Sequence, residues 1–542
     1  MLLSLVVLQS CVRGSDDRPV DDSGPPIVDS HSGDSDSGDS DSGDSDSTDT
    51  TDTTDTAATA GIVLQNLDVT TFSSVGYAVA EYRVTAAAPD AYTSPFPDAE
   101  PVFYVLMPAD ARPDEELPMV LFHHGGAIGD DRTSMPRQCQ EVHLDNWLTT
   151  QTDGSRSLAW MAAERRWVMV LPRNDWCDGW QGLGPDDPVD PVHHFGGYHE
   201  SRVLDFMRAG GAGFGVDRAK QYLWGTSAGG GTAVSSAYRD GGFAAVIMDS
   251  GFSSFFSYYE LPGSDGLPET GDLEDVFGGP PYDADGNPNG VIYDRYQSGS
   301  ADWEITEGGF SPRLFVAWNQ QDLNMQPRYG QEMEVAVAAG LPARGAGTHD
   351  FNRPFPTTDH HVQTVYLSLP NGYYTWALYE FLEGADMQVE EAESGCVAAA
   401  CVGVVHTAEE DQDYSRYSGG AERESAVGEV GVLYRAAVPD TVIAGVPTRV
   451  AVTLELETAG LPTTEYVGRI VVSEAGVDVG TLSLTAGDLA SPGSTAAGAL
   501  VRQFESTFLS YTPSAAADAE VRFETSGAAV LRIDSAIWLM GG

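Results

Sequence analysis

The chain has 542 residues, which is more than one ordinary domain needs and favours roughly two to four structural units. Its 28 basic and 81 acidic residues give a net charge of -53. A charge of this size repels nucleic-acid phosphates and anionic membrane surfaces, which argues against nucleic-acid binding as the function.

The N-terminal segment, residues 1–11, is apolar and ends in "LQSC". This ending is typical of a bacterial lipoprotein signal, in which Cys11 carries lipid and becomes the mature N-terminus, although the usual basic residues are missing. The run is too short to span a bilayer. We therefore expect an exported protein, either a cell-surface or outer-membrane lipoprotein or a secreted protein, that meets a membrane only through this anchor.

Residues 12–60 form a predicted tether, rich in Asp, Ser and Thr. From residue 29 on it has almost no apolar side chains, so it cannot bury enough surface to offset its chain entropy, and we predict a disordered spacer. Calcium binding by its aspartates is the less favoured interpretation, because no Gly/Asn-structured loop recurs in it.

The four cysteines beyond Cys11 suit an exported protein, where an even number favours two disulfides. The simplest pairing keeps each bond within its own region, Cys139 with Cys177 and Cys396 with Cys401. None has metal-site spacing beside histidines, so we expect no metal and no other cofactor.

Residues 61–387 are the first predicted folded domain. Alternating apolar and polar residues predict antiparallel strands between Gly61 and Leu106. Nearly continuous apolar runs then predict strands of a parallel sheet, buried on both faces, at 119–124, 167–174, 219–225, 243–250 and 313–320. Helix-like segments alternate with them, at 199–210, 327–340 and 373–384. Together these patterns predict an α/β fold with a doubly wound sheet.

Residues 388–542 differ, because helical patterns stop and period-two alternation between turns takes over. This pattern predicts an all-β sandwich. Its opening "VEEAESG" and its ending "LRIDSAIWL" resemble jelly-roll carbohydrate-binding modules. A purely structural sandwich that stabilises or spaces the first domain is the alternative.

A serine between glycines, in "YLWGTSAGGGTA" (residues 222–233), is the strongest chemical signal. An apolar strand precedes Ser227 and a helix of small residues follows it, which is the context of a nucleophile elbow. The flanking residues are small because the helix must approach closely. The pattern predicts that Ser227 is a nucleophile and that the backbone N–H of Ala228 binds an oxyanion.

A second oxyanion segment is predicted upstream, in "FHHGGAIGDD". A His-Gly-Gly after an early strand is typical of esterases, since glycine lets the backbone turn its N–H groups toward a carbonyl oxygen. The predicted donors are Gly125, Gly126 and Ala127, with His123 and His124 shaping the loop.

The acid and the base should follow the serine in the order Ser, Asp, His. Asp322, just past the strand at 313–319, is the favoured acid, and Asp249, after the preceding strand, is its competitor. His361 is the first choice of base, followed by His360 and then His349. The carboxylate would orient the imidazole and stabilise its protonated form.

The motifs "GTSAGGG" and "MDSGF" resemble those of pectin acetylesterases and the related Notum carboxylesterases. The segments "VMVLPRNDWCDGWQG", "HHFGGYHESRVLDFM", "VAWNQQDLNMQ" and "HVQ" are similar to further parts of that family, over about residues 118–380. The resemblance implies an α/β-hydrolase fold with Ser227, Asp322 and His361 (or His360) as the triad. The family's Gly-Gly-Gly-Trp-Cys oxyanion segment is replaced here by His-His-Gly-Gly-Ala, which leaves the substrate open.

The sequence as a whole predicts a monomeric exported serine esterase that hydrolyses acetyl or other short acyl esters, with polysaccharide as the favoured carrier. One alternative is a polyester depolymerase or a peptidase on the same fold. The other is a non-enzymatic surface protein that binds glycans.

Overall fold

The structure is a computed structural model that describes part of the chain. The described residues are 61–70, 76–85, 102–125, 165–172, 196–261, 273–274, 277–306, 310–319, 327–340, 354–355, 380–391, 401–407, 421–439, 442–456, 460–489, 508–514 and 519–541. The predicted lipoprotein signal and tether, residues 1–60, lie outside them, so both stay predictions.

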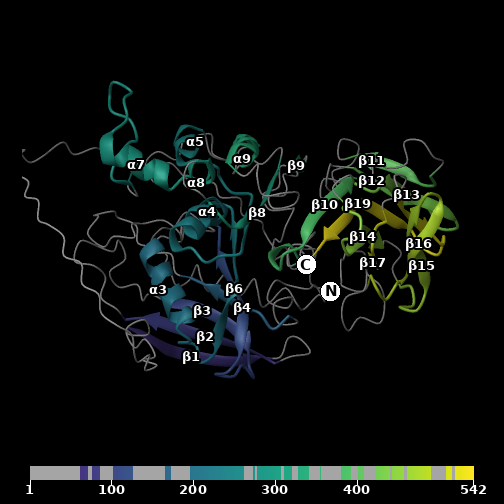
Figure 1. The fold of residues 1–542 in the computed structure, drawn as a ribbon, viewed down its shortest axis with the longest axis horizontal. Coiled ribbons are helices and arrows are strands. Elements are labelled where there is room, and N and C mark those ends of the chain that lie inside the picture. The colour runs from purple at the N-terminus through teal and green to yellow at the C-terminus, as the bar shows by residue number, and fades with distance from the viewer. Residues whose placement is uncertain are drawn as a thin grey trace, which may run out of the picture.

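The first part, here called the α/β region, holds one mixed sheet and the helices around it (Figure 1). Its strands are β1 (Ile62–Thr70), β2 (Tyr77–Val84), β3 (Val102–Pro108), β4 (Glu116–His123), β5 (Val168–Leu171), β6 (Gly215–Thr226), β7 (Ala245–Asp249), β8 (Arg313–Asn319) and β9 (Pro354–Phe355). Its helices are α3 (Gly196–Arg208), α4 (Ala228–Asp240), α5 (Phe255–Glu260), α7 (Gly290–Ser298), α8 (Ala301–Thr306) and α9 (Pro327–Gly340).

Within the described residues, the strand order in this sheet is β1-β2-β3-β5-β4-β6-β7-β8-β9. The first three strands are antiparallel neighbours, and β3 also pairs antiparallel with β5. From β5 through β4 and β6 to β9 every pairing is parallel. The predicted antiparallel entry and parallel core are therefore confirmed, and the fold is α/β.

The chain changes direction across the sheet at β4, because β5 lies on one side of it and β6 on the other. In open α/β sheets, ligands bind outside the carboxyl ends of two such neighbouring strands. The segments that follow β4 and β6 begin at His124 and Ser227, and these are the segments in which the sequence predicts chemistry.

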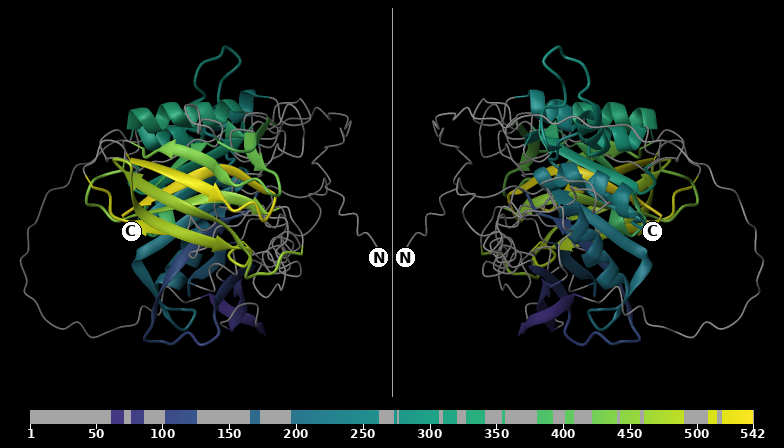
Figure 2. Two further views of the ribbon diagram at one scale, coloured as in Figure 1. Left: turned by 90° about the vertical axis from the view of Figure 1, so that its right-hand side faces the viewer. Right: turned by 90° about the vertical axis from the view of Figure 1, so that its left-hand side faces the viewer.

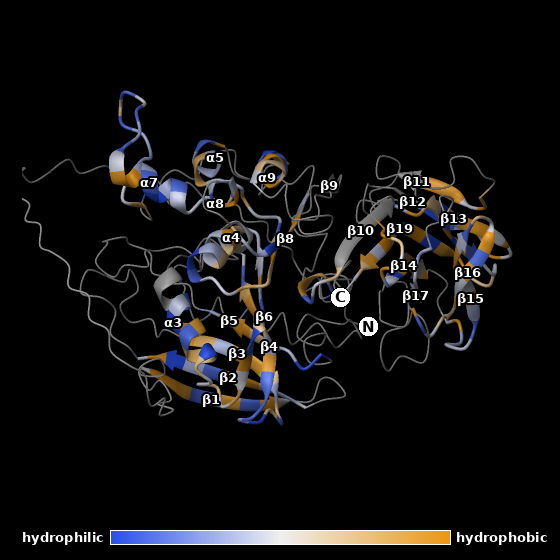
Figure 3. Ribbon diagram, in the orientation of Figure 1, coloured by the Kyte–Doolittle hydropathy of each residue, from blue (hydrophilic) through white to orange (hydrophobic). Residues whose placement is uncertain are grey.

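Both faces of the parallel strands are buried, which is why β4, β5 and β7 have nearly unbroken apolar sequences. Side chains of α3, α4, α8 and α9 share one hydrophobic cluster with the strands, and Figure 3 shows apolar residues concentrated along the central strands. Side chains alternate between faces along a strand, so Tyr222 points away from the face that Leu223 joins. Its ring contacts that of Trp167, with ring centres 5.0 Å apart.

The rest of the described chain, here called the C-terminal β region, contains strands only. They are β10 (Asp386–Glu391), β11 (Val404–Thr407), β12 (Ala421–Ser425), β13 (Gly431–Ala437), β14 (Thr448–Leu456), β15 (Tyr466–Glu474), β16 (Val477–Thr485), β17 (Leu509–Tyr511), β18 (Ala519–Thr525) and β19 (Leu531–Met540). The order in one sheet is β11-β12-β19-β14-β17, with β10 also paired to β19, and in the other β13-β18-β15-β16. Residues of both antiparallel sheets share one hydrophobic cluster, and Figure 2 (left) views these strands from their outer side.

The segment that leaves the α/β region lies against its sheet and then becomes a strand of the C-terminal β region. The predicted helix at 373–384 is described only from Glu380 on, where it is helical to residue 382, and β10 follows at Asp386. The Arg313 guanidinium lies 4.3 Å from the centre of the Phe381 ring and donates to the carbonyl oxygens of Phe381 and Ala385.

An ionic contact also joins the two regions. The Glu380 carboxylate accepts hydrogen bonds from Arg165, just before β5, and from Arg449 in β14. Burial alone would raise the pKa of Glu380, but the hydrogen bonds and charges of the two arginines outweigh it, and this pKa is lowered from its usual value. Glu380 is therefore held as a charged side chain between the two regions.

Candidate active site

Ser227 occupies a sharp turn between β6 and α4. Its backbone has φ 55° and ψ -127°, a combination that costs a residue other than glycine on the order of 1–3 kcal/mol. The residue is 8% exposed. Strand, strained turn and helix follow one another directly, which is the geometry that a nucleophile elbow requires.

The Ser227 hydroxyl does not act as a helix cap. Serine at the first position before a helix usually accepts a hydrogen bond from an N–H of the first turn. Here no such side-chain capping bond forms, although Ser227 is the N-cap residue of α4. The Ser227 N–H donates instead to the Asp249 carbonyl oxygen at 2.9 Å, which anchors the turn to β7. A purely capping role for this serine is therefore excluded.

The glycines around Ser227 are required by close backbone approach. A Cβ atom on Gly225 would clash with the Gly229 carbonyl group and lie 2.9 Å from the Ala233 Cβ. A Cβ on Gly230 would lie 2.8 Å from the Asp249 carbonyl oxygen. The small residues that suggested an elbow in the sequence thus let α4 approach β6 and β7.

The end of β4 lies beside the serine. A Cβ on Gly125 would be 3.0 Å from the Ser227 Cβ and 3.6 Å from its Oγ, so Gly125 sits directly against the nucleophile candidate. The His124 Nδ1 is 2.6 Å from the Gly125 carbonyl oxygen, and because a carbonyl accepts, this nitrogen carries the proton and donates. The Gly125 carbonyl is thereby held toward the His124 ring.

The predicted oxyanion donors are only partly described. Ala228 is the first residue of α4, and the first N–H groups of a helix have no acceptor within the helix, while the helix dipole favours negative charge there. Gly126 and Ala127 lie outside the described residues. Ala228 and Gly125 therefore stand beside Ser227, and the oxyanion role of all four residues stays a prediction.

The predicted acid and base are not settled by the described residues, since Asp322, His349, His360 and His361 lie outside them. The competing acid, Asp249, ends β7 and pairs in register with Thr226, the residue before the serine. Its carboxylate is buried and accepts a hydrogen bond from Ser250 Oγ at 3.1 Å. Asp322 and Asp249 both remain open as the acid.

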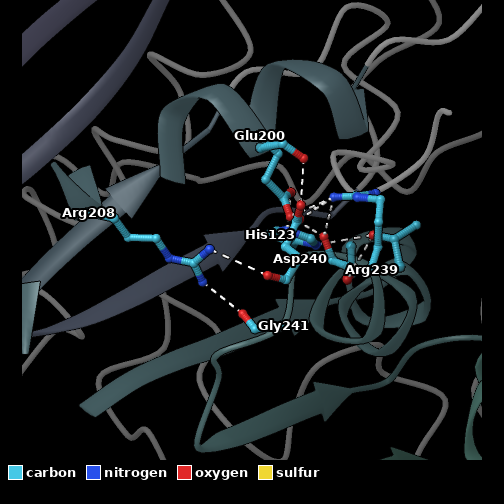
Figure 4. A network of polar contacts seen from close by, with 10 residues as sticks. His123, Glu200, Arg208, Arg239, Asp240 and Gly241 are labelled. Carbon is cyan, nitrogen blue, oxygen red and sulfur yellow. Dashed lines mark hydrogen bonds and ion pairs between the residues drawn. The ribbon is translucent and has the colours of Figure 1, made fainter. Parts of the chain in front are cut away.

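One buried acid near this site was missed in the sequence. Glu200, in α3, is fully buried and lies 2.6 Å from a ring nitrogen of His123 (Figure 4). A signal was present, because Glu200 has helical spacing to Val203, Leu204 and Met207, which form the buried face of α3. A carboxylate on an apolar stripe needs a charged partner, and the sequence pattern did not show which residue supplies it.

Aromatic side chains pack near the start of α4. Ala228 shares a hydrophobic cluster with rings from the segment between β7 and β8, including Phe252 and Phe255, and from α9. The Phe252 ring stacks on Tyr258, with centres 5.1 Å apart. The residue that follows Ser227 is thus packed among apolar side chains.

The remaining predictions for single residues are mostly untested. Cys401 is disulfide-bonded, whereas Cys139, Cys177 and Cys396 lie outside the described residues, so the proposed pairing stays a prediction. In the described part of the chain, no three His, Cys, Asp or Glu side chains gather as they would around a metal ion. Nor does any described helix combine the length and hydropathy of a membrane-spanning helix.

Comparison with known proteins shows similarity to solved structures only, since no protein-family model and no curated protein sequence matches the chain. An S-formylglutathione hydrolase from Agrobacterium tumefaciens is 15% identical, with a TM-score of 0.38, over 59% of this chain and 99% of the other. An acetyl xylan esterase from Paenibacillus sp. R4 is 15% identical, with a TM-score of 0.37, over 60% and 91%. Esterase B from Lactobacillus Rhamnosis is 14% identical, with a TM-score of 0.35, over 60% and 84%. Similarities this low decide neither reaction nor substrate.

Proposed function

We propose that the protein is an exported serine esterase with an α/β-hydrolase fold. The observation that carries the proposal is the backbone of Ser227, strained at φ 55° between β6 and α4, with Gly125 against its side chain. Strain of this kind persists only where the surrounding structure imposes it, and it clusters at active sites. Arg166, Ser250 and Ala475 also have a positive φ, but of these four described residues only Ser227 stands directly between a strand and a helix.

In the proposed mechanism, Ser227 Oγ attacks the ester carbonyl carbon while a histidine takes its proton. His361 is the favoured base, with His360 and His349 behind it, and Asp322 orients the ring. Backbone N–H groups of Ala228 and of the segment after β4 bind the oxyanion, after which the histidine returns the proton to the leaving alcohol. Water then hydrolyses the acyl-enzyme by the same steps.

The substrate proposal is an acetyl or other short acyl ester, carried on polysaccharide, as the resemblance to pectin acetylesterases implies.

The C-terminal β region is proposed to be a jelly-roll-like sandwich that binds carbohydrate or spaces the enzyme. Lipidation of Cys11 would hold a monomeric enzyme at the cell surface by its acidic tether. Globular residues 61–387 and 388–542 would then form the catalytic and accessory domains.

Replacing Ser227 with alanine should lower the kcat for p-nitrophenyl acetate by about 10⁴-fold or more, because the nucleophile is lost. The same change should abolish covalent labelling by a fluorophosphonate probe. A matched control is Ser235→Ala, which removes a similarly buried hydroxyl from α4, the helix that follows Ser227, and should keep the activity. Undiminished hydrolysis by the Ser227→Ala variant would end the proposal.

A further inference from the structure

A buried polar network joins the end of β4 to helices α3 and α4 (Figure 4). His123, the last residue of β4, places its Nε2 2.6 Å from Glu200 Oε2, and both side chains are fully buried. Its Nδ1 lies 3.2 Å from the Thr232 hydroxyl in α4. One histidine ring thus bridges two helices from the end of a central strand.

Both ring nitrogens of His123 meet acceptors. The Thr232 hydroxyl lies 3.2 Å from the Gly229 carbonyl oxygen and donates its one proton there. Its oxygen is then left to accept from Nδ1, while a Glu200 carboxylate oxygen lies 2.6 Å from Nε2. The ring is therefore held at both of its nitrogens.

Further donors hold the other oxygen of Glu200. Ser236 and Arg239, both in α4, donate to Oε1, the latter at 3.2 Å. Burial by itself would raise the pKa of the Glu200 carboxyl, but the interaction with His123, with smaller contributions from Arg239 and Ser236, lowers this pKa well below its usual value. Glu200 is consequently a carboxylate at neutral pH, fixed on both of its oxygens.

The network lies at the junction of the two halves of the proposed oxyanion site. His123 is two residues before Gly125, which touches Ser227. Thr232 and Ser236 belong to α4, which begins at Ala228 immediately after the serine. A displacement of β4 relative to α4 would therefore move Gly125 away from the nucleophile.

We propose that Glu200 is a positioning residue: through His123 it holds the end of β4 against α4, and so keeps the oxyanion donors aligned with Ser227. This inference rests on the proposed serine-hydrolase function. It assigns no proton transfer to Glu200 or His123, because both side chains are closed off from the substrate by burial.

The test is Glu200→Gln, which keeps the size of the side chain and removes the charge that holds His123. Kinetics are measured with p-nitrophenyl acetate, and the concentration of competent sites is titrated with a fluorophosphonate. We expect kcat per titrated site to fall about 100-fold, the effect of losing an oxyanion donor, with KM unchanged within about twofold. The rate of fluorophosphonate labelling should fall in parallel, because that reaction uses the same donors.

A matched control is Glu304→Gln, which neutralises a buried carboxylate of α8 outside the network and should leave kcat per site unchanged. Ser236→Ala removes one hydrogen bond to Glu200 and should give an intermediate loss, which supplies a second variant if Glu200→Gln folds poorly. A merely structural role would reduce the number of titrated sites without changing kcat per site.

Unchanged kcat and labelling rate per site in both network variants would overturn the positioning role. A rise in KM alone would also overturn it, since ground-state binding would then be the quantity affected. If the wild-type protein is labelled but hydrolyses no ester, the esterase proposal fails, while the labelling rates still decide the role of Glu200. If the wild-type protein is not labelled at all, both proposals fall.

Discussion

Replacing Gly229 with alanine is expected to abolish ester hydrolysis and to destabilise the α/β region. The added Cβ would lie 2.6 Å from the His123 carbonyl oxygen and closer still to that of His124. These are backbone atoms at the end of β4, so no side chain can rotate away. Either β4 or α4 must shift, at a cost of about 1–3 kcal/mol for overpacking, and the shift separates Gly125 from Ser227.

The measurement for Gly229→Ala is kcat for p-nitrophenyl acetate together with the denaturant midpoint of unfolding. Gly76→Ala is the matched control, because among the described residues its Cβ would meet the Ala109 Cβ alone, at an ordinary 3.6 Å. That variant should unfold at the wild-type midpoint and retain full activity. Wild-type activity in the Gly229→Ala protein would show that α4 need not approach β4 so closely.

Replacing Glu380 with glutamine is expected to destabilise the protein by about 3 kcal/mol, somewhat less than for a fully buried pair because Arg449 is partly exposed. The neutral amide leaves Arg165 and Arg449 near each other without the charge that they share. Thermal unfolding should then begin at a lower temperature, and a single transition should separate into two if this contact couples the regions.

Lowering the pH should destabilise the wild-type protein in the same way as Glu380→Gln. The pKa of Glu380 is lowered in the folded state, so its contribution is present above the unfolded pKa of about 4.3 and is lost as pH falls through the lower folded value. Glu383→Gln is the control, since that carboxylate pairs with Arg165 in a more exposed position and contributes about 1 kcal/mol or less. A Glu380→Gln protein as stable as this control would contradict the prediction.

Much of the α/β fold could be predicted because the relevant signals are local. Continuous apolar runs indicate strands buried on two faces, and β4, β6, β7 and β8 lie where such runs occur. Ser227 was recognisable for a related reason: a strained turn needs small neighbours, and these stand next to it in the chain. Signals of this kind depend only on residues that are consecutive in the chain.

Contacts between distant segments could not be predicted in this way. Glu200 and His123 are separated by a long stretch of chain, and only the order of strands brings α3 beside the end of β4. The placement of β5 between β3 and β4 likewise depends on crossover connections that the apolar pattern does not encode. Pairing of Glu380 with Arg449 needs both regions in place, because Arg449 belongs to the C-terminal β region.

Because Ser227 has a positive φ, a substitution that stabilises the fold at this position is expected to remove the activity. Glycine adopts such a backbone conformation readily, whereas serine is strained in it. The substitution that relaxes this turn is therefore also one that removes the proposed nucleophile. A variant at this position can therefore be more stable to heat and still lack catalytic activity. Directed evolution for thermal stability alone would enrich inactive proteins unless catalytic turnover were selected at the same time.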